Sequence, residues 1–187
     1  MVEEQLVFAF HKDRMCAFER AQLQTDSCFG GPLEVDLSGV EHGPRPLHLI
    51  ARLGGSHILG LGFGLPLIYG MSYSGCDLRY RIDGVGKIEI LKLQPTESSE
   101  DWPYRNFPPL LPYVPLRLSD APALVDYSEF AQRFPNMPEQ QPAELVVAVP
   151  PPATVGLSLW GAGDGEGVTI VFEYDLEDRI VSSYNVT

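Results

Sequence analysis

The sequence predicts an α+β fold that is mainly β: an antiparallel sheet or sandwich-like packing, about one helix and a long proline-rich strap. Two observations support this prediction. Glycine and proline are abundant, at 18 and 17 of 187 residues, and turn-rich chains favour short strands over helical bundles. The chain is also 44% hydrophobic, which is enough for a proper core. We expect a single compact domain over residues 1–187, with a two-lobe division within residues 95–142 as the alternative.

The N-terminal region contains several candidate strands. Residues 5–10 form an apolar run, whereas residues 14–23 fit a second strand or a short helix, because their periodicity does not decide between the two. Residues 33–37 alternate apolar and acidic side chains, which is typical of a half-exposed strand. Residues 47–53 are a further candidate.

A hairpin is the clearest local prediction. Apolar and polar residues alternate over residues 78–83, and the chain returns over residues 87–93. Between them Gly84 and Gly86 flank Val85, and glycine adopts the positive φ of a tight turn without steric penalty.

Proline dominates the middle of the chain, since 13 of the 17 prolines lie in residues 95–152. Proline cannot donate a backbone hydrogen bond and restricts the preceding residue, so long strands and helices are not expected over most of this stretch. Residues 123–134 are the exception, with Ser119 or Asp120 as the cap and Pro135 at the end. Apolar residues recur there at helical spacing, namely Leu124, Tyr127, Phe130, Ala131 and Phe134.

The C-terminal part is predicted to form a meander of sequential antiparallel strands. Four runs of β-branched and aromatic residues, at residues 144–149, 155–160, 168–174 and 179–186, have the composition of strands.

Charge and cysteine content limit the partners and the compartment. The formal net charge is −12, so phosphate backbones and anionic membranes are disfavoured and a basic protein is favoured. Cys16, Cys28 and Cys76 are odd in number and widely spaced, which is typical of reduced thiols. The N-terminus lacks the basic and apolar segments of a secretory signal. We therefore expect a cytoplasmic protein that binds neither nucleic acid nor membrane.

No motif for catalysis, nucleotide binding or metal binding is complete. The glycine-rich run at residues 54–64 lacks the third glycine of a dinucleotide fingerprint, and no serine has the flanking glycines of a nucleophile elbow. Cysteine and histidine do not occur at metal-ligand spacing. We expect no cofactor and no metal, and the chain is more typical of a non-enzyme. A hydrolase triad assembled from distant residues remains an alternative.

Acidity is concentrated in the C-terminal third. Residues 119–187 hold 11 acidic and 2 basic residues. Such a field accelerates association with a basic partner, such as a toxin bound by an immunity-type inhibitor, although solubility explains it equally well. The candidate partner-binding residues are Glu173, Asp175, Glu177 and Asp178.

Two further features suggest a pocket for a small apolar or sugar-like ligand. If residues 59–65 form a strand, Gly60, Gly62 and Gly64 leave one of its faces bare, and the chain itself or a ligand must lie against them. The proline-rich segment carries the aromatic residues Trp102, Tyr104, Phe107 and Tyr113. These side chains either cover the core as a strap or act as binding anchors.

Overall fold

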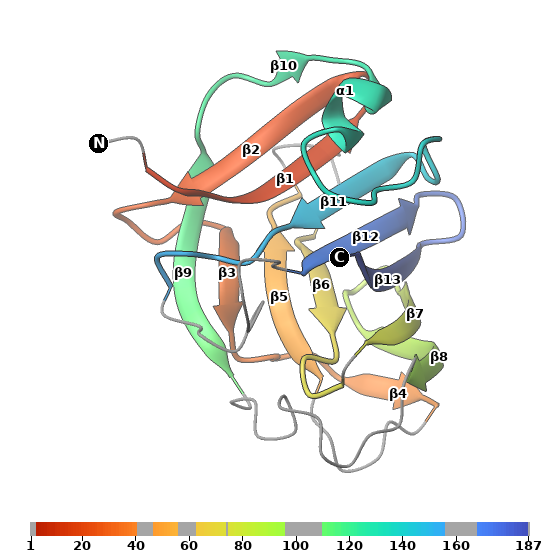
Figure 1. Cartoon of the computed structure of the whole chain (residues 1–187). Helices are drawn as coiled ribbons and strands as arrows, with labels where there is room; N and C mark the ends of the chain where they lie inside the picture. The colour runs from red at the N-terminus through yellow and green to blue at the C-terminus, as the bar shows by residue number, and fades with distance from the viewer. Residues whose placement is uncertain are drawn as a thin grey trace.

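Strands dominate the computed structural model, which describes residues 3–40, 47–55, 63–73, 75–95, 110–155 and 168–186. Within these residues 13 strands belong to one sheet, and one short helix lies against it (Figure 1). The strands are β1 (Gln5–His11), β2 (Arg14–Arg20), β3 (Ser27–Gly31), β4 (Leu37–Gly39), β5 (His48–Leu53), β6 (Leu65–Tyr69), β7 (Cys76–Ile82), β8 (Ile88–Pro95), β9 (Leu111–Leu118), β10 (Ala123–Leu124), β11 (Leu145–Val149), β12 (Thr169–Asp175) and β13 (Ile180–Val186).

The sheet is mixed. Its strand order is β4-β8-β7-β13-β12-β11-β1-β2-β9-β3-β5-β6, and β10 pairs with β2 beside this path. Among the described strands, β4 and β8 run parallel, whereas the other pairs are antiparallel. Figure 1 shows the sheet coiling, so that β6 at one end approaches β13 and β7 near the other.

Hydroxyl groups from β7 and β13 close this coil. The Tyr80 hydroxyl donates to the Pro66 carbonyl at 2.8 Å and accepts from the Ile68 N–H at 3.0 Å. The Ser183 hydroxyl donates to the Ile68 carbonyl at 3.1 Å. These backbone groups lie on the side of β6 that faces away from β5, where an edge strand would otherwise present unpaired polar groups. Proline is tolerated there because no ladder N–H is lost.

Side chains fill both faces of the central strands. The main core lies inside the coiled sheet and includes Phe18, Phe29 and Tyr80, and a second core lies on the other face of β1, β11 and β12. The helix α1 (Tyr127–Ala131) covers this second core and packs Phe130 against Phe10 with a ring-centroid distance of 5.4 Å.

Several sequence predictions are confirmed. The hairpin is formed by β7 and β8, with Ile82 opposite Ile88, and β7 alternates buried and exposed residues throughout. Residues 5–10, 47–53, 144–149, 168–174 and 179–186 correspond to β1, β5, β11, β12 and β13, each within two residues. Residues 14–23 contain a strand, β2, and not a helix.

The predicted helix over residues 123–134 is wrong in extent and in its cap. It begins at Tyr127, and the Asp126 carboxylate caps it by accepting from the Glu129 N–H at 2.8 Å. Neither Ser119 nor Asp120 is the cap. Leu124 is 81% exposed in β10, opposite Arg14, because the sheet edge competes with the helix for these residues.

Two strand predictions also need correction. The strand predicted at residues 33–37 begins only at Leu37. Conversely, the proline-rich segment contains the eight-residue strand β9, although it includes Pro112 and Pro115. The Pro115 carbonyl accepts a hydrogen bond from the Ala21 N–H at 2.7 Å, just beyond the end of β2. The nitrogen and carbonyl of one strand residue point to the same side, so the Pro115 nitrogen also points toward Ala21 and away from β3. At Pro115 the pairing of β9 with β3 therefore loses no donor.

The predicted proline-rich strap is not seen among the described residues. From Leu110 onward the segment forms β9, β10 and α1, and residues 96–109 lie outside the described part of the chain. No helix in the described part has the length and hydropathy needed to cross a bilayer.

Candidate functional site

The predicted acidic residues lie at one end of β12 and in the turn that follows it. Glu173 and Asp175 belong to β12, and Glu177 and Asp178 belong to the turn. The Asp175 Oδ1 accepts from the backbone N–H of Glu177 at 2.9 Å and of Asp178 at 3.0 Å. Arg179, the last residue of this turn, has a φ of 55°. An aspartate that holds two following amides fixes the conformation of its turn, so these carboxylates have defined positions.

A fifth carboxylate joins them from another part of the chain. Glu144 precedes β11, and Leu145 lies opposite Tyr174 in the antiparallel register. The Glu144 Oε2 accepts from the Leu176 N–H at 3.2 Å. Sequence analysis did not select Glu144, because only the pairing of β11 with β12 brings it close.

Tyr184 fixes the orientation of Glu173. Its hydroxyl donates to Glu173 Oε1 at 2.6 Å. Burial and the adjacent carboxylate both raise the pKa of Tyr184 well above its ordinary value. The hydroxyl therefore keeps its proton and remains a donor to Glu173 across the physiological pH range.

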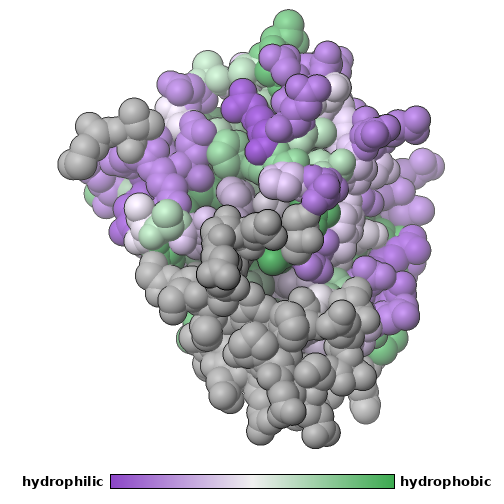
Figure 2. Space-filling view, in the orientation of Figure 1, coloured by the Kyte–Doolittle hydropathy of each residue, from purple (hydrophilic) through white to green (hydrophobic). Residues whose placement is uncertain are grey.

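These residues line a shallow depression of about 320 Å³, which we call the acidic depression. Its carboxylates come from Glu144, Glu173, Asp175 and Glu177, and Arg79 and Ser182 lie among them, whereas Asp178 does not line it. Arg79 makes no ion pair within the described residues. Figure 2 shows hydrophilic side chains along the side of the molecule where the β12–β13 turn lies in Figure 1.

The acidic depression suits hydrogen-bond donors better than metal ions. Over the described residues, no group of three or more His, Cys, Asp or Glu side chains has the geometry to hold a metal. Glu144, Asp175 and Glu177 are exposed and Glu173 is half-buried. Exposed carboxylates on ordered backbone can accept charge-assisted hydrogen bonds from lysine and arginine side chains.

The predicted pocket residues are only partly described. Gly60, Gly62, Trp102, Tyr104 and Phe107 lie outside the described residues. Gly64 and Tyr113 are described, and both line a groove on the outer face of β9, β3 and β5. Gly64 precedes β6 and does not belong to a strand. The side chain that lies against its bare face is Arg52, whose Cγ and Cδ would be 3.1 Å from a Cβ at residue 64.

This groove, which we call the arginine groove, consists of two adjoining hollows. Their volumes are about 630 and 710 Å³. The residues shared by both hollows are Glu34, Arg52, Phe63 and Gly64. Sequence analysis missed Arg52, because a single arginine in an apolar strand carries no local pattern.

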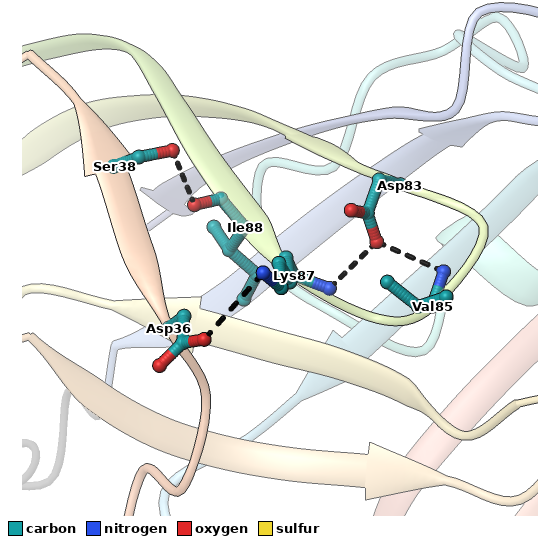
Figure 3. A network of polar contacts seen from close by, with 6 residues as sticks. All are labelled: Asp36, Ser38, Asp83, Val85, Lys87 and Ile88. Carbon is teal, nitrogen blue, oxygen red and sulfur yellow. Dashed lines mark hydrogen bonds and ion pairs between the residues drawn. The ribbon is translucent and has the colours of Figure 1, made fainter.

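The turn between β7 and β8 borders the second hollow (Figure 3). Asp83 Oδ1 accepts from the backbone N–H of Val85 at 2.9 Å and of Lys87 at 2.8 Å. The Lys87 ammonium group lies 3.8 Å from the Asp36 carboxylate, and a dashed line marks this ion pair in Figure 3. Asp83 therefore orders one wall of the groove in the way that Asp175 orders the rim of the depression.

The three cysteines are buried, and their thiols have raised pKa values. Burial raises the pKa of Cys76 to about 11, and the adjacent Asp77 makes a smaller contribution in the same direction. Burial also raises the pKa of Cys16 and Cys28, although Arg52 opposes the shift at Cys28. Thiols with raised pKa values are poor nucleophiles at neutral pH.

Comparison with known proteins provides no relative. No family model matches the chain, and neither a curated protein nor a solved structure matches it. No activity, substrate or partner therefore carries over from another protein.

Proposed function

We propose that this chain is a non-enzymatic binding protein whose acidic depression docks a basic segment of a partner protein, as an immunity-type inhibitor docks a toxin. One observation carries the proposal. Carboxylates from β12, from the β12–β13 turn and from the loop before β11 converge on the same depression. Four carboxylates face a single guanidinium there. A lysine or arginine side chain is the natural complement of such a surface.

Preorganisation supports this proposal. Three of the four carboxylates already accept hydrogen bonds from the protein: Glu144 from a backbone amide, Glu173 from Tyr184, and Asp175 from two turn amides. A carboxylate has two oxygens and several lone pairs, so each keeps capacity for an incoming donor. Less side-chain entropy is then lost on binding than at a flexible acidic surface.

The charge of the whole chain would assist encounter. The net charge of −12 favours diffusion of a cationic partner toward the molecule. Because the depression is exposed, salt would screen its field, with a Debye length of about 8 Å at physiological ionic strength. Binding should therefore depend strongly on salt concentration.

The test uses the basic product of a neighbouring open reading frame, titrated against the full chain by calorimetry at two salt concentrations. The test variant combines Glu144→Lys, Glu173→Lys and Glu177→Lys, and it keeps Asp175 because that residue orders the turn. We expect its affinity to fall by about 10- to 100-fold and its salt dependence to weaken.

A matched control separates the site from net charge. Asp120→Lys, Glu129→Lys and Glu139→Lys reverse three exposed carboxylates in the same third of the chain without touching the depression. This control should weaken binding by less than about threefold. Equal losses in both variants, or no binding by any neighbouring product, would contradict the proposal.

A further inference from the structure

The arginine groove is a concave site built on the outer face of the sheet, and it shares no lining residue with the acidic depression. Cys28 lies opposite Arg52 in the β3–β5 register, and Arg52 lies opposite Pro66 in the β5–β6 register, so these side chains share one face. The neighbouring residues Phe29, Ala51 and Leu67 face the main core. The floor of the groove is therefore the outer face of strands whose other face packs into the main core.

Arg52 has no ion-pair partner among the described residues. It is partly buried, and it lines both hollows. Removing part of the water around a guanidinium is unfavourable unless another acceptor replaces that water. Its planar fork matches the two oxygens of a carboxylate.

The other lining groups define the rest of the ligand. Asp26 and Glu34 line the first hollow together with Arg52, and both are exposed. These carboxylates would disfavour a simple anion but would favour a molecule that also carries an ammonium group. Phe63 and Tyr113 line the same hollow with aromatic surface.

We propose that the arginine groove binds a small zwitterion of the amino acid or short-peptide class. Its carboxylate binds Arg52, its ammonium group lies toward Asp26 and Glu34, and its apolar body contacts Phe63 and Tyr113. This arrangement gives the Arg52 guanidinium an acceptor, which none of the described residues supplies as an ion pair, and it places the ammonium group of the ligand beside two carboxylates.

Backbone geometry fixes the walls of this groove. Gly30 and Gly31 have φ values of 63° and 89° at a bulge in β3. A Cβ at residue 30 would stand 2.3 Å from the Pro112 carbonyl oxygen, and one at residue 31 would stand 3.0 Å from the Tyr113 ring. The absence of both Cβ atoms allows β9 to approach β3 and lets the Tyr113 ring lie over Gly31. Bulges of this kind commonly aim side chains beside binding sites.

The experiment titrates the full chain with a panel of free apolar amino acids and their dipeptides, using calorimetry and ligand-observed NMR. We expect at least one probe to bind the unaltered chain and Arg52→Gln to weaken that binding by about tenfold or more. The control Arg81→Gln removes an exposed arginine outside the groove and should change affinity by less than about twofold. Circular dichroism would verify that both variants fold.

Modified probes test each end of the zwitterion. The C-terminal amide of the best probe should bind about as weakly as the parent binds Arg52→Gln, and the N-acetylated form should also bind more weakly than the parent. Failure of every probe to bind at about 10 mM, a range that corresponds to negligible affinity, would overturn the proposal. So would equal affinity for the chain and Arg52→Gln. Equal affinity for the N-acetylated form would overturn the role of Asp26 and Glu34.

Discussion

The acidic depression and the arginine groove lie on different parts of one sheet, and they hold charge in different ways. In the depression, carboxylates gather at strand ends and in a turn, where water reaches most of them. In the groove, one guanidinium is partly buried against the sheet, and its stem lies over a glycine. Exposed like charges act together over a distance and are screened by salt. A partly buried cation acts at short range and depends on the shape of its surroundings.

The difference predicts how each site should respond to mutation. Charge changes in the depression should alter salt dependence and association rate, with little effect on folding. Changes to the groove should alter both ligand binding and stability, because its walls are also the contacts between β3, β9, β5 and β6. Three predictions test this contrast.

Gly30→Ala should be the most destabilising of these changes. The new methyl group would stand 2.3 Å from the Pro112 carbonyl oxygen, and residue 30 has a positive φ. Strain and overpacking together should lower the free energy of unfolding by about 3 kcal/mol, measured by urea denaturation.

Gly86→Ala is the matched control for this prediction. Residue 86 has a φ of 86°, but nothing lies within 4 Å of a Cβ there. Its free energy of unfolding should fall only by the cost of placing alanine at a positive φ, about 1 kcal/mol. Equal losses at the two positions would show that the close approach of β9 to β3 is not important for stability.

Tyr80→Phe should be the next largest change. It removes the hydroxyl that satisfies the Pro66 carbonyl and the Ile68 N–H inside the coiled sheet. Two buried backbone groups would lose their partner, which should lower the free energy of unfolding by about 2 kcal/mol.

Tyr184→Phe provides the comparison beside the acidic depression. It removes a hydrogen bond of 2.6 Å to Glu173, but that carboxylate is half-buried and water can replace the donor. We expect a loss below about 1 kcal/mol. A larger loss for Tyr184→Phe than for Tyr80→Phe would contradict the idea that buried polar contacts inside the coiled sheet contribute more to stability than the half-buried contact at Glu173.

The fold was predictable where a strand carries a strong local signal. In β7 that signal is the alternation of buried and exposed residues, because burial on a half-exposed pleated strand has a period of two. In β11, β12 and β13 it is the run of β-branched and aromatic residues, although β11 is buried on both faces. The helix was overextended because Leu124 has helical spacing but pairs at the sheet edge. Strand β9 was missed because the side to which the Pro115 nitrogen points depends on its neighbours, which local sequence does not specify.

The candidate sites were predictable only in part, for the same reason. The acidic run at residues 173–178 stands out in the sequence, whereas Glu144 joins it only through the register of β11 with β12. Gly64 and Tyr113 were selected for their residue types, but the partly buried arginine between them has no signature at all. Long-range pairing determines which side chains meet, and a single sequence reports mainly local preferences.

The smallest predicted effect concerns the aspartate that orders the wall of the groove. Hydrogen bonds from the Lys87 and Val85 amides lower the pKa of Asp83 below its ordinary value of 3.8. A lowered folded-state pKa means that the stabilisation is present above that ordinary value and is lost as the pH falls through the folded-state pKa. Exchange of the Val85 and Lys87 amide protons, followed by NMR from about pH 5 down to pH 2, should therefore accelerate at the acid end beyond the intrinsic pH dependence. Asp83→Asn keeps an acceptor oxygen but cannot titrate, so the same acceleration in that variant would show that Asp83 does not order this turn.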